Sequence, residues 1–117
     1  MTILLIEQGK HPVKKTIDGS LRSMQELVGG LIQAIYPFED PVVLVCNDEG
    51  KLEGLEPNRA LRHPETHQVY DIICGSFFLC GLGEEDFDDL SPTLLEKYRE
   101  MFYYPELFIR VSHPDAE

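Results

Sequence analysis

Two arginines in a polar stretch are the residues best suited to bind a charged ligand. Residues 56–68 have no clear hydrophobic period and contain two prolines, which predicts a loop. A guanidinium can hold a carboxylate or phosphate through two parallel hydrogen bonds. The two arginines and the polar residues near them in the sequence form a candidate ligand site: Asn58, Arg59, Arg62, Tyr70, Asp71 and Ser76. The alternative is that the arginines form internal ion pairs, for example with Asp71.

A run of acidic residues is the second candidate site. Between positions 84 and 89 five of six residues are acidic, namely Glu84, Glu85, Asp86, Asp88 and Asp89, and Phe87 interrupts the run. Three interpretations compete: a solvated loop that keeps the protein soluble, a cation site, and a surface that binds a basic protein. The EF-hand pattern is missing, which argues against calcium. Carboxylates on alternate residues of a strand would lie about 6.6 Å apart, close to the phosphate spacing of DNA, so the third interpretation includes DNA mimicry.

Other motifs with catalytic or metal-binding chemistry are weak. The glycines at positions 81 and 83 are not followed by the lysine of a phosphate-binding loop. Ser76 lacks the Gly-x-Ser-x-Gly pattern of a nucleophilic serine. A zinc set would need cysteine spacings that the chain does not have, since its candidate ligands are His63, His67, Cys74 and Cys80. We therefore expect no metal and no cofactor, and the balance is against an enzyme.

Composition narrows the class of protein further. The 117 residues include 21 acidic and 10 basic residues, for a formal charge of −11, which disfavours direct binding to nucleic acid. Residues 1–37 carry four bases and three acids, so the acidity belongs to residues 38–117. No apolar run is long enough for a membrane span, and the first residues do not resemble a signal peptide. Three cysteines, each in an apolar run, predict buried free thiols and a cytoplasmic protein: Cys46, Cys74 and Cys80.

The hydrophobic pattern predicts one α+β domain over residues 1–112 and a frayed tail over residues 113–117. Two helices begin after the N-cap residues Ser20 and Ser91. We predict strands over residues 3–6, 13–17, 31–36, 42–46, 51–55, 69–79 and 107–111, with a bend or bulge at Gly75. The sheet should be mainly antiparallel or mixed, and the hairpin–helix opening is compatible with a β-grasp-like start.

Several ordered segments carry a family resemblance. They are residues 25–30, 35–41, 46–52, 57–61 and 70–78, and the likeness extends from about residue 2 to about residue 110. In these segments the chain resembles the family called domain of unknown function 3846. The resemblance implies a small cytoplasmic protein of Gram-positive gut bacteria, phages or conjugative elements, sometimes near antirestriction-type genes. It implies no activity, cofactor or site residue.

The leading hypothesis is a non-enzymatic interaction module whose acidic run binds an unknown protein with a basic surface. A DNA mimic or antirestriction accessory of a mobile element is a special case of this hypothesis. The alternatives are a small-ligand binder or enzyme that uses the site around Asn58, Arg59 and Asp71, and a structural domain without a dedicated site. The partner and the oligomeric state remain open at this stage.

Overall fold

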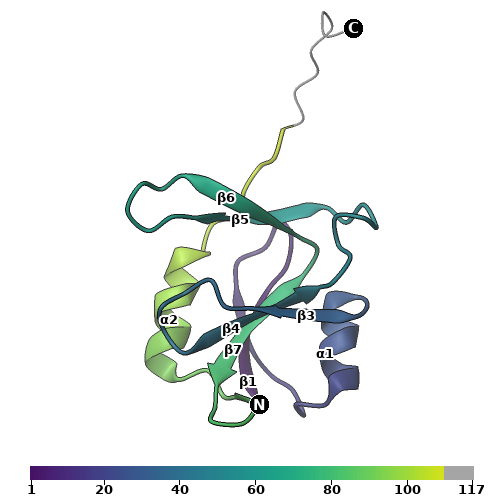
Figure 1. The fold of residues 1–117 in the computed structure, drawn as a ribbon, viewed down its shortest axis with the longest axis vertical. Coiled ribbons are helices and arrows are strands. Elements are labelled where there is room, and N and C mark those ends of the chain that lie inside the picture. Colours follow the sequence, from purple (N-terminus) through teal and green to yellow (C-terminus); the bar gives the residue numbers. More distant parts are fainter. Residues whose placement is uncertain (110–117) are drawn as a thin grey trace, which may run out of the picture.

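The structure is a computed structural model and describes residues 1–109. The predicted tail and the end of the predicted last strand lie outside these described residues. Within residues 1–109, eight strands and two helices form one α+β domain (Figure 1): β1 (Thr2–Ile6), β2 (Val13–Thr16), α1 (Leu21–Val28), β3 (Ile32–Ile35), β4 (Val42–Asn47), β5 (Pro57–Arg62), β6 (Val69–Cys74), β7 (Phe77–Leu82), β8 (Phe87–Asp88) and α2 (Pro92–Met101).

The main sheet has six strands in the order β2-β1-β7-β4-β3, and the short β8 also pairs with β7. The other two strands, β5 and β6, form a separate two-stranded sheet that lies across one end of the molecule (Figure 1). All strand pairings in the described residues are antiparallel. The predicted antiparallel sheet with two helices is therefore confirmed.

Each face of the main sheet packs against a different layer. Alternate residues of a strand point to opposite faces, so β1, β4 and β7 supply both cores. One core lies under α1 and includes Met24, Val28 and Phe78. The other lies under α2 and the β5–β6 hairpin and includes Tyr98 and Phe77. The two helices therefore lie on opposite sides of the sheet (Figure 1).

Both predicted helix starts are confirmed at the level of hydrogen bonds. The side chain of Ser20 accepts a hydrogen bond from the Ser23 backbone N–H, and Ser91 does the same for Leu94. Gly29 follows α1 with a φ of 78°, a left-handed conformation that glycine adopts without steric cost. Local side-chain chemistry thus sets the bounds of both helices.

Three strand predictions are wrong. Residues 51–54 form a turn and residue 55 lies in no strand, whereas residues 57–62, which we predicted as a loop, form β5. The single strand predicted over residues 69–79 is two strands, because Gly75 has a φ of 82° and turns the chain from β6 into β7. The described residues 107–109 of the predicted last strand form no strand.

We predict that Gly81→Ala destabilises the fold by about 3 kcal/mol, since overpacking forces the backbone to move. A Cβ atom there would lie 2.2 Å from the carbonyl oxygen of Asp89, where the segment after β8 closes on β7. Gly9→Ala is the control, because its Cβ would meet no atom within 4 Å and only its φ of 75° is strained, at a cost of about 1 kcal/mol. Urea unfolding measures both, and equal losses would contradict the packing argument.

Candidate functional site

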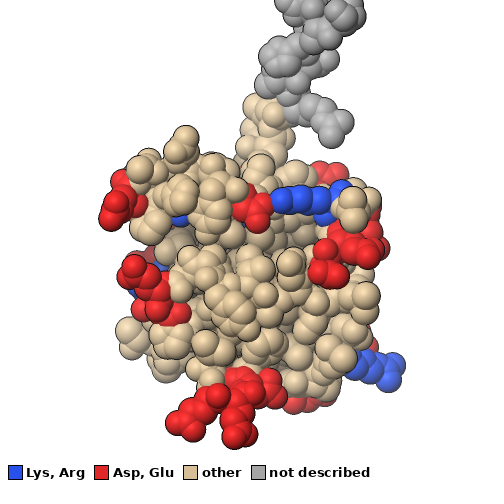
Figure 2. All heavy atoms as spheres, viewed as in Figure 1, with Lys and Arg blue, Asp and Glu red and all other residues tan. Residues whose placement is uncertain are grey.

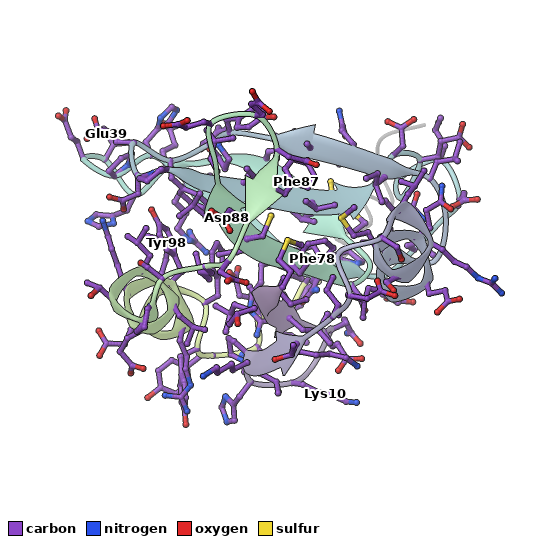
Figure 3. The ribbon with its side chains drawn as sticks, turned by 90° about the horizontal axis from the view of Figure 1, so that it is seen from below. Lys10, Glu39, Phe78, Phe87, Asp88 and Tyr98 are labelled. Carbon is purple, nitrogen blue, oxygen red and sulfur yellow. The ribbon has the colours of Figure 1, made fainter. Side chains whose placement is uncertain are left out.

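The five predicted acidic residues form an exposed loop at one end of the molecule. Glu84, Glu85 and Asp86 occupy the turn between β7 and β8, and Asp88 and Asp89 follow. Figure 2 shows acidic side chains gathered at this end, and Figure 3 views the same end with Phe87 and Asp88 in front of the sheet. None of the five pairs with a lysine or arginine of residues 1–109.

Hydrogen bonds to the backbone fix part of this acidic loop. The Asp86 carboxylate accepts from the Phe87 N–H, and the Asp88 carboxylate accepts from the Asp89 N–H, both at 2.7 Å. Asp89 accepts from the Thr2 N–H at 2.7 Å, which ties the loop to β1. The run bends through a turn, and only Phe87 and Asp88 are in a strand. The five carboxylates therefore do not form an extended row along one strand.

A hollow of about 420 Å³ lies beside the loop. We call it the acidic hollow, and its lining joins apolar residues near α1 to the carboxylates of the loop: Met1, Gly19, Leu21, Met24, Asp86, Phe87, Asp88 and Asp89. Leu21 is 55% exposed, so an apolar side chain is available to a partner there. The Met1 ammonium donates a hydrogen bond to the Ile17 carbonyl oxygen at its inner side. Sequence reasoning found the carboxylates and Phe87 but missed the apolar neighbours Met1, Leu21 and Met24.

Two residues of the predicted ligand site, Asn58 and Arg59, are buried. Arg59 has no exposed surface, and it donates to the carbonyl oxygens of Phe102 at 3.1 Å and of Lys10 at 2.7 Å. It also donates to the Asn58 side-chain oxygen at 2.8 Å. The Asn58 amide in turn donates to the carbonyl oxygens of Ile6 and Gly75, each at 2.9 Å. Burial lowers the pKa of Arg59, while the carboxylate of Glu106 opposes this effect.

The other members of that predicted site lie apart from this buried pair. Asp71 accepts a hydrogen bond from the Lys51 ammonium at 2.6 Å, so the predicted pairing of an arginine with Asp71 is wrong. Arg62 contacts Glu106 at 3.3 Å, and Tyr70 is 48% exposed on β6. Ser76 lies in the connection between β6 and β7. The structure thus does not bring the six residues together around one ligand.

Arg62 and Tyr70 instead line a cleft that sequence reasoning missed. The aromatic cleft, as we call it, has a volume of about 370 Å³ and lies between α2, the β5–β6 hairpin and the β3–β4 turn. Its lining includes Phe38, Asp40 and Lys97. Their signal in the sequence was slight, because they come from segments that are distant in the sequence from the hairpin that completes the cleft.

Two cysteines line a third cavity, of about 400 Å³, between the end of β4 and β6. Burial raises the pKa of the Cys46 thiol to about 11, and it also raises that of Cys74. Cys80 is fully buried and its pKa is raised to about 12. A raised pKa keeps a thiol protonated at neutral pH, which is the opposite of nucleophilic activation. All three cysteines are free, as predicted, and Cys46 and Cys80 are buried, whereas Cys74 is partly exposed, so the predicted burial is wrong for Cys74.

In the described part of the chain, no group of three or more histidine, cysteine, aspartate or glutamate side chains could hold a metal ion. Among residues 1–109, no helix is long and apolar enough to cross a membrane.

The family described as domain of unknown function (DUF3846) matches residues 1–103 of the chain. The chain belongs to the DUF3846 family. The match extends from β1 through α2, so every strand and helix described above lies in the DUF3846 domain. No curated protein and no solved structure matches the chain. The predicted family is confirmed, and family membership assigns this DUF3846 protein no activity.

We predict that Arg59→Lys destabilises this DUF3846 domain by about 3 kcal/mol, because the lysine cannot reach all the buried acceptors and leaves some unsatisfied. Arg62→Lys is the matched control on the same strand. Its side chain is 49% exposed with a single ion pair, so the loss should be about 0.5 kcal/mol or less. Urea unfolding followed by circular dichroism measures both, and a small loss for Arg59→Lys would show that the buried network is dispensable.

We also predict that stability falls above pH 9. Unfolded thiols ionise near their ordinary pKa of 9.0, whereas native Cys46 and Cys80 stay protonated to about 11 and about 12. The unfolded state then binds fewer protons, and stability drops by roughly 1.4 kcal/mol per pH unit for each thiol. Urea unfolding from pH 8 to pH 11 tests this, with the double variant Cys46→Ala/Cys80→Ala as control. An equal pH slope in both proteins would refute the assignment.

Proposed function

We propose that this DUF3846 protein is a non-enzymatic interaction module that binds a basic protein surface through the acidic hollow. One observation carries the proposal: three exposed carboxylates, those of Asp86, Asp88 and Asp89, line a hollow that also has an apolar lining. Glu84 and Glu85 lie in the adjoining turn, and none of the five acidic residues has an ion-pair partner in the described chain. A loop that only keeps the protein soluble would require the carboxylates. It would not require the exposed Leu21 and the half-buried Phe87 that lie beside them.

The two kinds of group in the hollow would contribute differently to binding. Exposed carboxylates attract a basic surface over several ångströms and speed association, but salt screens them. Apolar contacts with Leu21 and Phe87 would add affinity that salt does not remove. A partner segment that presents lysine or arginine next to an aliphatic side chain would match both. We therefore propose a basic, partly apolar protein segment as the partner.

Other partner classes fit less well. Nucleic acid would be repelled by the formal charge of −11. The cytoplasm is the compartment we propose, because the three free cysteines suit a reducing environment. A role in a phage or mobile element, with an antirestriction activity, is a hypothesis that depends on the resemblance alone.

The experiment compares two variants that lose the same number of charges at different places. The loop variant carries Glu84→Gln, Glu85→Gln, Asp86→Asn and Asp88→Asn, and it keeps Asp89 because that carboxylate binds the Thr2 N–H. The control variant neutralises four other exposed carboxylates: Glu49, Glu53, Glu56 and Glu65. The probe is a fluorescent peptide that alternates lysine and leucine, and binding is followed by fluorescence anisotropy.

We predict that the loop variant weakens peptide binding about tenfold or more at 50 mM salt, whereas the control variant changes it by less than about twofold. Raising the salt concentration to 300 mM should weaken binding to the unmodified protein and reduce the difference between the variants. Equal losses in both variants would mean that only net charge matters, and would refute a dedicated surface.

A further inference from the structure

The aromatic cleft has the size and the lining of a small-molecule site. Its volume of about 370 Å³ falls within the range of roughly 300–1,000 Å³ that ligand pockets occupy. Three segments that are distant in the sequence form it: the β3–β4 turn, the β5–β6 hairpin and α2 with the residues that follow. In Figure 3, Tyr98 of α2 and Glu39 of the β3–β4 turn lie on the same side of the molecule. The cleft is separate from the acidic hollow and shares no lining residue with it.

Aromatic and apolar side chains form the inside of the cleft. Tyr98 and Phe102 are 1% and 3% exposed and belong to the core. The ring of Phe38 packs on that of Tyr98, with centroids 4.5 Å apart. Met101 and Tyr70 remain 54% and 48% exposed, although both line the cleft. A ligand with an apolar body would therefore cover side chains that are now in contact with water.

Asp40 supplies a carboxylate in a fixed position at the cleft. Its Oδ2 atom accepts a hydrogen bond from the Tyr98 hydroxyl at 2.7 Å and another from the Lys97 ammonium at 2.6 Å. No hydrogen bond to the Oδ1 atom is formed within residues 1–109, and this atom is not enclosed by the protein, so it is available to a ligand. The bonds from Lys97 and Tyr98 lower the pKa of Asp40, which keeps the carboxylate ionised at neutral pH.

The charge balance at the cleft favours a cation. Each of the two basic side chains already has an acidic partner, since Lys97 pairs with Asp40 and Arg62 pairs with Glu106. The third acidic residue of the lining, Glu39, has no ion-pair partner in the described chain. The lining thus carries one more negative than positive charge. Aromatic ring faces also attract cations.

We propose that the aromatic cleft binds a small organic cation with an aromatic body, such as an arylalkylamine. The ring of the ligand packs against Phe38, Tyr70 and Met101, and its ammonium donates a hydrogen bond to Asp40 Oδ1. An anion of the same shape would meet an excess of carboxylates. A neutral ligand would gain the apolar contacts and lose the charged hydrogen bond, which makes charge the discriminating property.

The test uses three probes that share a phenyl ring and differ in charge: 2-phenylethylamine, 2-phenylethanol and phenylacetate. Each is titrated into ¹⁵N-labelled protein, and amide shifts locate and quantify binding. We expect saturable shifts at Tyr70, Lys97 and Met101, with the amine binding about tenfold more tightly than the alcohol, as one charge-assisted hydrogen bond predicts. Phenylacetate should bind more weakly than either.

Two pairs of variants assign the contacts. Asp40→Asn keeps the size of the side chain and an oxygen that can accept from Tyr98. It should remove the preference for the amine and leave binding of the alcohol unchanged, whereas the exposed control Glu65→Gln should alter neither. Tyr70→Ala should weaken both the amine and the alcohol, whereas Tyr36→Ala, which removes a tyrosine that is 59% exposed outside the cleft, should not.

Three results would overturn the proposal. Equal affinities for the amine, the alcohol and the acid would exclude charge recognition. Shifts confined to residues 84–89 would show that the amine merely binds the acidic loop. The absence of saturable binding by all three probes would exclude the site for this class of ligand.

Discussion

The buried hydrogen bonds of Asn58 and Arg59 hold the β5–β6 hairpin to the rest of the molecule. Asn58 bonds to the end of β1 and to the β6–β7 connection, and Arg59 bonds to the β1–β2 turn and to the C-terminal cap of α2. The hairpin pairs with no strand of the main sheet. Without these bonds it would depend on a few apolar contacts, such as those of Leu61 and Ile73. Carbonyl oxygens, the negative end of α2 and the nearby, partly exposed carboxylate of Glu106 compensate the buried guanidinium charge.

The placement of the few basic residues decides which surfaces remain acidic. Arg59 is buried and bonds to backbone carbonyl oxygens. Four other basic residues form ion pairs with acidic residues at α2, the hairpin and the turn after β4: Lys51, Arg62, Lys97 and Arg99. None of them reaches the β7–β8 turn, although all five lie in the acidic part of the chain. Within residues 1–109 the acidic residues 84–89 are therefore left without an ion-pair partner, and they are concentrated where the loop is bonded to β1.

Local signals in the sequence predicted the helices and the main sheet well, because serine caps, a glycine stop and apolar runs act over a few residues. The hairpin was not predictable in the same way. Pro57, Asn58 and Arg59 resemble a loop, and only a long-range view shows that their polar atoms bond to four distant segments. A β-bulge between Pro57 and Arg59 also breaks the alternation that identifies a strand. Gly75 indicated a bend or bulge within the largely apolar segment of residues 69–79, but the sequence did not show that the two halves belong to different sheets, since periodicity does not report φ.

The hydrogen bonds that attach the β5–β6 hairpin also explain why the aromatic cleft exists beside α2, which packs on the main sheet. Arg59 bonds to the Phe102 carbonyl at the end of α2 and so fixes the spacing between this helix and β5. Ala60 donates its N–H to Glu106, which holds the chain beyond α2 against the same strand. Between these two attachments the hairpin extends past the core and leaves Tyr70 and Met101 facing a space that no side chain fills. The two walls of the cleft are therefore set by buried bonds before any ligand arrives, and binding need not order them.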